Sequence, residues 1–227
     1  MSIGRLSNPL ALAVLTLLDE RPMHPYEMST TLRERHKEDS IKLNYGSLYS
    51  VVTSLQKYGL IEVQETAKAG NRPERTIYAI TGSGRAKMTD WLSELISTPG
   101  REFTSFEAAL SLMAALPPDE VIRLLEIRVN SLQVKQHSSE AVFSSVPPNF
   151  PQIFMIESEF QHALLLTEID FVRKLLQRLK TEELTGVKGW RRMHEMRAAG
   201  ASPDQIDAVM RADFGLDGWT EDAPGQP

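Results

Sequence analysis

The chain has 227 residues, of which 41% are apolar and 24% charged, a composition typical of a folded globular protein. It contains no cysteine, so disulfides and thiolate metal sites are excluded. The net charge of −5 is uneven, because residues 1–98 carry +1 and residues 99–227 carry −6. The apolar run Leu10–Leu18 is too short to span a bilayer and lacks the layout of a secretion signal, so we expect a cytoplasmic protein.

Two helix patterns open the chain. Apolar residues recur from Leu10 to Leu18 and predict a mostly buried helix over residues 9–20. Pro25 suits the first position of a second helix, because the N–H that proline lacks has no partner at that position. We expect this second helix to end near residues 35–38 and to support the helix that follows it.

A third helix pattern, over residues 44–58, separates two unlike faces. One face is an apolar stripe, formed by Leu48, Val51, Val52 and Leu55. The other face is small, neutral and rich in hydroxyl groups, and consists of Ser47, Ser50, Thr53 and Ser54. Side chains of this size allow close approach to a phosphate backbone or to base edges. Gly59 is a good stop for the helix, because glycine has no Cβ to clash at positive φ.

A β-hairpin pattern follows this helix. Residues 60–63 begin one strand, and residues 76–80 alternate as the returning strand. Between them, residues 67–74 contain turn residues and the cations Lys68 and Arg72. A helix, a sharp turn and a hairpin with a basic tip are typical of a winged helix-turn-helix, which places one helix in a DNA groove. The same residues also fit a helix and hairpin in an unrelated α+β core, so both alternatives stay open here.

A fourth helix closes the first half of the chain. Thr81 can cap the free N–H groups of its first turn, and its apolar stripe includes Trp91. The break at Thr98–Gly100 marks a domain boundary. We therefore predict a winged helix-turn-helix DNA-binding domain over residues 1–98.

The second half of the chain predicts helices over about 103–116, 118–138 and 154–179, with a proline-rich hinge at 146–151. The last of these carries a stripe near the 3.5-residue spacing of packed helices, formed by Ile156, Phe160, Leu164, Phe171, Leu175 and Leu179. We expect the preceding helix and a second chain to cover it, so residues 99–184 form a helical dimerisation domain. The tail, residues 185–227, predicts one short helix near residues 202–211 and is otherwise partly mobile. The predicted fold class is mostly α with a small β-hairpin wing.

Two segments carry a resemblance to a known family: YGSLYSVVTSLQKYGLI at residues 45–61 and NRPERTIYAITGSG at residues 71–84. Together with LALAVLTLLDERPMHPYEMSTTLRER at residues 10–35, they resemble the PadR family of transcriptional regulators, in its longer type with a helical C-terminal dimerisation domain. The resemblance implies a sequence-specific repressor that acts as a homodimer on a palindromic operator and is released by a small aromatic or hydrophobic effector. Glu74 departs from the family, which is often basic or neutral between the wing arginines, and an acid there repels phosphate.

The DNA-contacting residues follow from this arrangement and from the resemblance. We expect Asn44, Tyr45, Ser47 and Ser50 to lie nearest the groove, and the Tyr49 hydroxyl to contact sugar-phosphate. The cations expected at phosphates are Lys42, Lys68, Arg72 and Arg75. The resemblance further implies that Trp91 lines an effector site at the dimer interface, and the alternative is that its indole is simply part of a packed core.

Catalysis is not indicated. The sequence has no P-loop, dinucleotide-binding glycine signature, nucleophile elbow or His-Glu-x-x-His motif. We therefore expect no enzyme activity, no cofactor and no metal site, and the expected partners are double-stranded DNA and a second copy of the chain rather than a membrane. The alternative function is a winged-helix protein-interaction adaptor without strong DNA binding, which the low charge of residues 1–98 and Glu74 favour.

Overall fold

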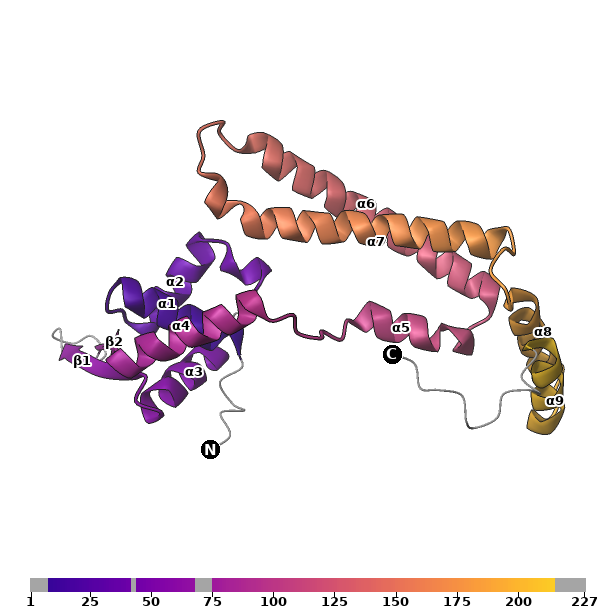
Figure 1. The fold of residues 1–227 in the computed structure, drawn as a ribbon, viewed down its shortest axis with the longest axis horizontal. Helices are drawn as coiled ribbons and strands as arrows, with labels where there is room; N and C mark the ends of the chain where they lie inside the picture. The colour runs from indigo at the N-terminus through magenta and orange to yellow at the C-terminus, as the bar shows by residue number, and fades with distance from the viewer. Residues whose placement is uncertain (1–7, 42–43, 68–74, 215–227) are drawn as a thin grey trace. The chain divides into compact units, whose positions relative to one another are not determined.

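The computed structural model describes residues 8–41, 44–67 and 75–214, and the chain divides into two compact units, Met1–Glu102 and Phe103–Pro227 (Figure 1). Nearly all of the regular structure is helical, and a two-stranded hairpin lies in the first unit. The predicted fold class is thus confirmed. Within the described ranges, no helix combines the length and the apolar character that a membrane span requires.

The first unit contains the predicted succession of helices and hairpin. Its elements are α1 (Pro9–Glu20), α2 (Pro25–Glu34), the 3₁₀ turn η1 (Lys37–Asp39), α3 (Tyr45–Lys57), β1 (Ile61–Ala67), β2 (Arg75–Ile80) and α4 (Gly82–Ser97). The helix starts follow their capping residues. Asn8 Oδ1 accepts a hydrogen bond from the Leu10 N–H at 3.0 Å, and Thr81 Oγ1 accepts one from the Gly84 N–H at 3.0 Å.

Helix α1 is the centre of the first unit's core. Leu10, Val14 and Leu15 have no exposed surface, and α1 contacts α3, α4 and β2. The other elements contribute Met28, Leu48, Leu55, Ile61, Ile80 and Trp91 to the same core. Burial of a Leu or Val side chain contributes roughly 1.5–3 kcal/mol, so packing on α1 decides where α3 lies.

The hairpin is attached to the helices through backbone hydrogen bonds of β2. Ile61 pairs with Ile80 in the antiparallel ladder. Met23, between α1 and α2, donates its N–H to the Tyr78 carbonyl at 3.0 Å and accepts the Tyr78 N–H at 3.1 Å. The wing is therefore tied to the turn that leads into α2.

Two glycines shape the turns at the base of the hairpin. Gly59 ends α3 with φ at +67°, as predicted, and its carbonyl accepts the Thr81 hydroxyl at 2.8 Å. Gly84 lies so close to the first strand that a Cβ on it would be 2.0 Å from the Leu60 carbonyl oxygen. This close approach lets α4 start directly against the α3–β1 turn.

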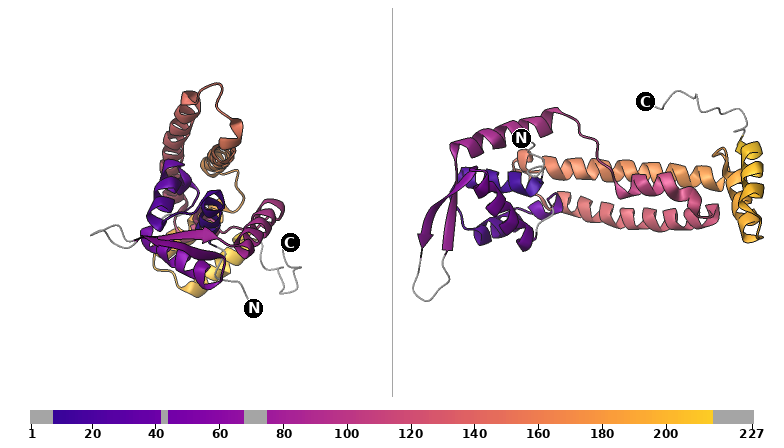
Figure 2. Two further views of the ribbon diagram at one scale, coloured as in Figure 1. Left: turned by 90° about the vertical axis from the view of Figure 1, so that its left-hand side faces the viewer. Right: turned by 90° about the horizontal axis from the view of Figure 1, so that it is seen from below.

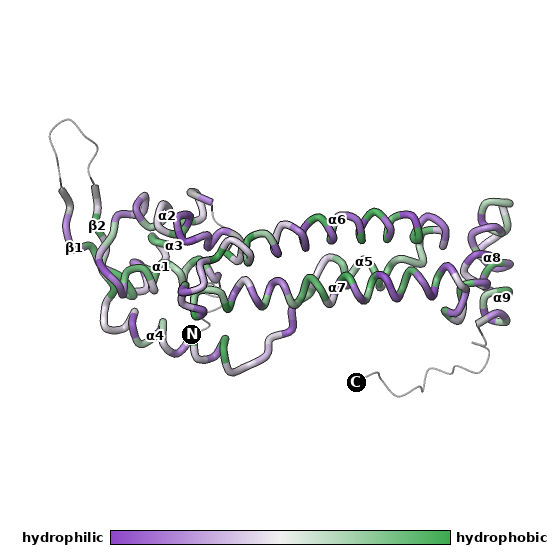
Figure 3. The backbone as a smooth tube through the Cα atoms, turned by 90° about the horizontal axis from the view of Figure 1, so that it is seen from above, coloured by the Kyte–Doolittle hydropathy of each residue, from purple (hydrophilic) through white to green (hydrophobic). Residues whose placement is uncertain are grey.

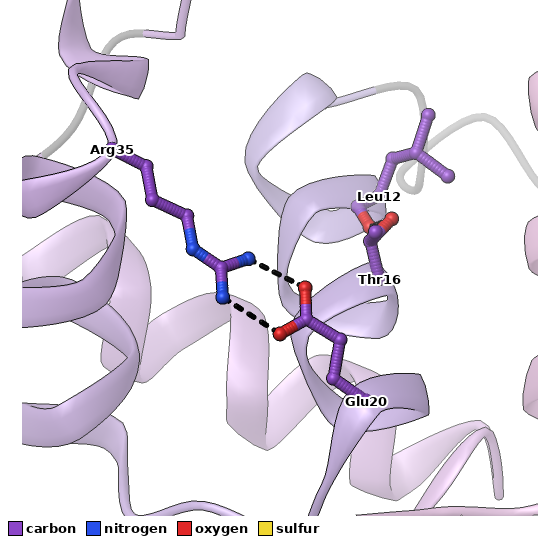
Figure 4. Close-up of polar contacts among 4 residues, drawn as sticks. All are labelled: Leu12, Thr16, Glu20 and Arg35. Carbon is purple, nitrogen blue, oxygen red and sulfur yellow. Dashed lines mark hydrogen bonds and ion pairs between the residues drawn. The ribbon is translucent and has the colours of Figure 1, made fainter. Parts of the chain in front are cut away.

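Ion pairs join the helix ends around α1. The Arg35 guanidinium donates two hydrogen bonds to the Glu20 carboxylate, at 2.5 and 2.7 Å (Figure 4). Arg85 Nε donates to Asp19 at 2.9 Å. The hydrogen bond from Arg35 lowers the pKa of the Glu20 carboxyl below its ordinary value.

The second unit is entirely helical where it is described. Its elements are α5 (Ser105–Leu112), η2 (Met113–Ala115), α6 (Pro118–Ser145), η3 (Gln152–Phe154), α7 (Ile156–Lys180), α8 (Val187–Ala198) and α9 (Pro203–Phe214). Helices α6 and α7 run antiparallel side by side (Figure 2). Apolar and polar residues follow one another along both helices (Figure 3). Helix α6 extends to Ser145, beyond its predicted end near residue 138, because residues 139–145 carry no helix breaker.

The predicted stripe on α7 is buried only in part. Leu175 and Leu179 lie in the core, whereas Ile156, Phe160 and Leu164 are more than half exposed. In a single chain α6 therefore covers the C-terminal half of α7 and leaves apolar side chains uncovered in the N-terminal half.

The prediction of one short helix in the tail is wrong. The tail forms two helices, α8 and α9, and α8 is part of the second unit's core through Val187 and Trp190. Gly186, at φ +89°, turns the chain so that α8 packs back on α6. The sequence pattern did not indicate this packing, because the residues that cover Trp190 come from distant helices.

We expect Gly84→Ala to destabilise the first unit by about 1–3 kcal/mol or more, because the new Cβ would overlap the Leu60 backbone. Gly82→Ala is the matched control in the same helix, since nothing lies within 4 Å of a Cβ built there. Calorimetric unfolding of the two variants checks this. Equal melting temperatures for both would contradict the close approach of α4 to β1.

We expect Glu20→Gln to lower stability at neutral pH. Because the folded-state pKa of Glu20 is depressed, the ion pair stabilises the fold above the ordinary value of about 4.5, and the contribution is lost as the pH falls through the folded value. Both side chains are over 40% exposed, so the effect is at most about 1 kcal/mol. Urea unfolding at pH 7 and in acid checks this, and a difference from wild type that persisted in acid would show another cause.

Candidate nucleic-acid interface

The exposed side of α3 carries the predicted hydroxyl face, defined as Ser47, Ser50, Thr53 and Ser54. Helix α3 is held from behind by Leu48, Val52 and Leu55, all at most 2% exposed. Ser50 and Thr53 are exposed, and Ser47 and Ser54 are partly buried. The face is therefore open to solvent and rigidly supported by the core around α1.

Most of these hydroxyls donate to the helix's own backbone. Ser50 Oγ donates to the Gly46 carbonyl at 2.9 Å, and Ser54 Oγ donates to the Ser50 carbonyl at 2.8 Å. Thr53 Oγ1 likewise donates to the Tyr49 carbonyl at 2.9 Å. A hydroxyl whose proton is used in this way presents its oxygen lone pairs outward, as an acceptor. The middle of α3 thus offers acceptors, which match the amino groups on base edges better than phosphates.

The start of α3 is different, because it offers donors. Asn44 Oδ1 caps the helix by accepting the Ser47 N–H at 2.6 Å, so its amide nitrogen is left to donate. Asn8 does the same at the start of α1, where its Oδ1 accepts the Leu10 N–H. Helix N-termini also carry partial positive charge, so this end of α3 suits a phosphate.

The two asparagines lie in one groove. It has a volume of about 410 Å³ and is lined by Asn8, Ala11, Asn44, Gly46, Ser47, Ser50, Val51 and Ser54. Three of the predicted DNA-contacting residues, Asn44, Ser47 and Ser50, therefore share this groove with α1. Tyr45, the first residue of α3, is not among the residues that line it. Asn8 was not predicted as a site residue, although an Asn-Pro pair at a helix start is a recognisable capping signal.

The structure describes some of the other predicted DNA-contacting residues. Tyr49 is about half exposed on α3, and Arg75 is the first residue of β2. Lys42, Lys68 and Arg72 lie outside the described residues. Several cations in the rest of the first unit are paired with acids, among them Arg21 with Glu27 and Arg85 with Asp19. The hydroxyl face itself is neutral, so charge for DNA backbone contacts must come from its flanks.

Trp91 lies in the core of the first unit rather than on an open surface. Its indole is 8% exposed and packs in the cluster centred on α1. The groove described above does not include it. This placement favours the packing role, and contact between Trp91 and an effector stays a prediction.

Comparison with known proteins supports the winged-helix architecture. Bacillus subtilis PadR in complex with operator DNA has a TM-score of 0.59 and 17% identity, covering 76% of this chain and 99% of that chain. The same protein in complex with p-coumaric acid has a TM-score of 0.58 and 15% identity, with 75% and 98% covered. A PadR-like transcriptional regulator from Bacillus cereus has a TM-score of 0.51 and 15% identity, with 79% and 99% covered.

At these identities the solved structures establish the fold alone. No curated protein matches the sequence. The model of the Transcriptional regulator PadR-like family matches residues 14–90, which include the larger part of α1, all of α2 to β2 and the larger part of α4. Residues 14–90 of this chain are therefore a domain of the PadR-like family.

Proposed function

We propose that the chain is a sequence-specific DNA-binding transcriptional regulator that uses α3 as its recognition helix. The observation that carries the proposal is the solvent-open hydroxyl face, held on a PadR-like domain next to two capping asparagines. In this proposal the asparagine amides and Ser47 contact phosphates at the start of α3. Ser50 and Ser54 then face base edges in the major groove, and the wing cations Lys68, Arg72 and Arg75 bind phosphates.

We propose further that the regulator is a homodimer on a palindromic operator. The uncovered apolar residues of the second unit support this: they include Ile127, Val134 and Val142 on α6 and Ile156, Phe160 and Leu164 on α7. A second copy would cover them and would present two α3 helices to half-sites about one DNA turn apart. The complexes of Bacillus subtilis PadR with operator DNA and with p-coumaric acid support a cytoplasmic repressor released by a small aromatic effector.

The direct test is selection of binding sequences from a random duplex pool at low salt, combined with light scattering. We expect enrichment of a two-fold symmetric motif and a dimer mass at micromolar concentration. If the protein enriches no sequence, the DNA-binding proposal is wrong. A monomer mass would overturn the proposed homodimer. It would not decide the DNA-binding proposal, which the selected motif tests separately.

The second candidate function is a protein-interaction adaptor. The observation in its favour is the neutral hydroxyl face in a unit whose residues 1–98 carry only +1. An adaptor of this kind would retard DNA weakly and without sequence preference, and the same selection experiment separates the two functions.

We expect Asn44→Asp to weaken DNA binding without weakening the fold. The new carboxylate still accepts the Ser47 N–H and suits the helix N-terminus, so stability should stay within about 0.5 kcal/mol of wild type. It also replaces an amide donor by a charge that repels phosphate, and we expect at least about a tenfold loss of affinity. Asn44→Ala is the control, which loses the cap and about 1 kcal/mol of stability. If the Asn44→Asp variant bound DNA with wild-type affinity, Asn44 would not be part of the DNA interface.

We expect Arg72→Ala to weaken all duplexes similarly and to reduce the salt dependence of binding by about one phosphate contact, because the wing cation is proposed to bind the backbone. Arg85→Ala makes the same charge change at a guanidinium already bonded to Asp19, and should leave the salt slope unchanged. Titrations at several salt concentrations measure both. A change in sequence preference alone would make Arg72 a base reader.

A further inference from the structure

The segment that follows the first unit, α5 with η2, is held to the second unit by few contacts. None of its residues, Ser105–Ala115, is buried. Its inner side chains, Phe106, Leu110 and Met113, are only partly buried against the core, and Leu112 is 70% exposed. A helix of eight residues is not stable by itself, so the position of α5 depends on the groups that anchor it.

One anchor comes from the tail helix α8. The Trp190 indole Nε1 donates to the Leu116 carbonyl at 2.8 Å, and His194 Nε2 lies 3.0 Å from the Ala114 carbonyl. A carbonyl only accepts, so Nε2 of His194 carries the proton. These carbonyls lie at the end of η2, where the last carbonyl groups of a helical segment have no N–H donor within the helix. Helix α8 therefore caps the C-terminal end of the α5–η2 segment from a distance of more than seventy residues in sequence.

Helix α8 is itself firmly placed. Trp190 is 7% exposed and packs in one cluster with Val121, Leu125 and Leu179. Arg191 donates to Asp119, in the first turn of α6, at 2.5 Å. The two donors to η2 thus come from a helix docked on the start of α6.

A second anchor fixes the other end of the segment. The Arg128 guanidinium lies 3.6 Å from the centre of the Phe106 ring, and Arg128 Nε donates to Glu168 on α7 at 2.7 Å. The α5–η2 segment is therefore anchored at Phe106 near one end and at the η2 carbonyls at the other, with Leu110 and Met113 packed in part against the core between them.

We propose that Trp190 and His194 are positioning residues, which keep α5 docked and so set the length of the tether between the DNA-binding unit and the dimerising unit. With α5 docked, the tether consists of the seven residues 98–104, between α4 and α5. With α5 released, the tether becomes residues 98–117, which is twenty residues. The inference rests on the proposed function, because a tether matters only if two DNA-binding units act together.

Tether length changes how strongly the second half-site is bound. The effective concentration of a tethered domain falls roughly as the −3/2 power of tether length. An increase from seven to twenty residues therefore lowers it about fivefold. We expect release of α5 to weaken binding to a duplex with two half-sites by up to about fivefold and to leave binding to a single half-site unchanged.

The experiment uses the full-length chain and compares four single variants and one double variant with wild type. Trp190→Phe keeps an apolar ring and removes the indole donor. His194→Ala removes the second donor at a partly exposed position outside the buried core, and His194→Gln restores a donor. Arg192→Ala is the matched control on α8, because its partner is Asp213 on α9 rather than η2.

Hydrogen exchange and DNA titration are both measured, on operator duplexes obtained by the selection described above. In the double variant Trp190→Phe/His194→Ala, we expect amide exchange in residues 105–116 to rise about 30-fold, from the loss of two hydrogen bonds, with exchange in residues 172–179 unchanged. The ratio of two-half-site to single-half-site affinity should fall by up to about fivefold. His194→Gln should keep wild-type exchange, as should Arg192→Ala.

Three outcomes would overturn the inference: unchanged exchange in α5–η2, exchange that rises equally throughout the second unit, or faster exchange in α5 with an unchanged affinity ratio. The second outcome would mean that the two residues only stabilise the core. If the wild-type protein selects no duplex, the proposed function is wrong instead. The wild-type protein alone reveals that case, without any variant.

Discussion

Burial of α1 is the constraint on which the candidate interface depends. This helix is apolar on nearly every side, and α3, α4 and the hairpin all pack on it. Because its largest side chains have no exposed surface, a shift of α1 would open cavities in the core. The apolar stripe of α3 must therefore face α1, and the hydroxyl groups on the opposite side must face solvent. The chemistry offered to a ligand follows from this packing and not from loop geometry.

Electrostatics in the first unit divides the cations into two groups. Arg35 and Arg85 pair with Glu20 and Asp19 at the end of α1, where they join α1 to α2 and α4, and Arg21 pairs with Glu27 on α2. Arg75 instead begins β2, and Lys68 and Arg72 follow α3 in the sequence but lie outside the described residues. Each of these ion pairs removes one positive and one negative charge together, so the net charge of residues 1–98 stays at +1 whether or not the pairs form.

Local signals made the first unit predictable from sequence, and long-range contacts limited prediction in the second. Gly59 at positive φ, the Thr81 cap and the start of α1 each depend on residues within one helical turn. Helix α8 depends instead on Trp190, whose partners lie on α6 and α7, and a sequence pattern cannot show such partners. At the candidate interface the hydroxyl face was predictable from periodicity, whereas Asn8 was missed because its proximity to Asn44 arises only when α1 and α3 pack together.

The internal hydrogen bonds of the hydroxyl face have a kinetic consequence for a DNA-binding regulator. Ser50, Thr53 and Ser54 satisfy their own protons against the helix backbone, and none of them carries charge. Such a surface gains little from an arbitrary stretch of duplex, so dwell times on unrelated genomic sites would be short. A regulator that reads DNA through such a helix would search by frequent dissociation and rebinding, and its time on the chromosome would be concentrated at the few sites whose base edges complement those oxygens.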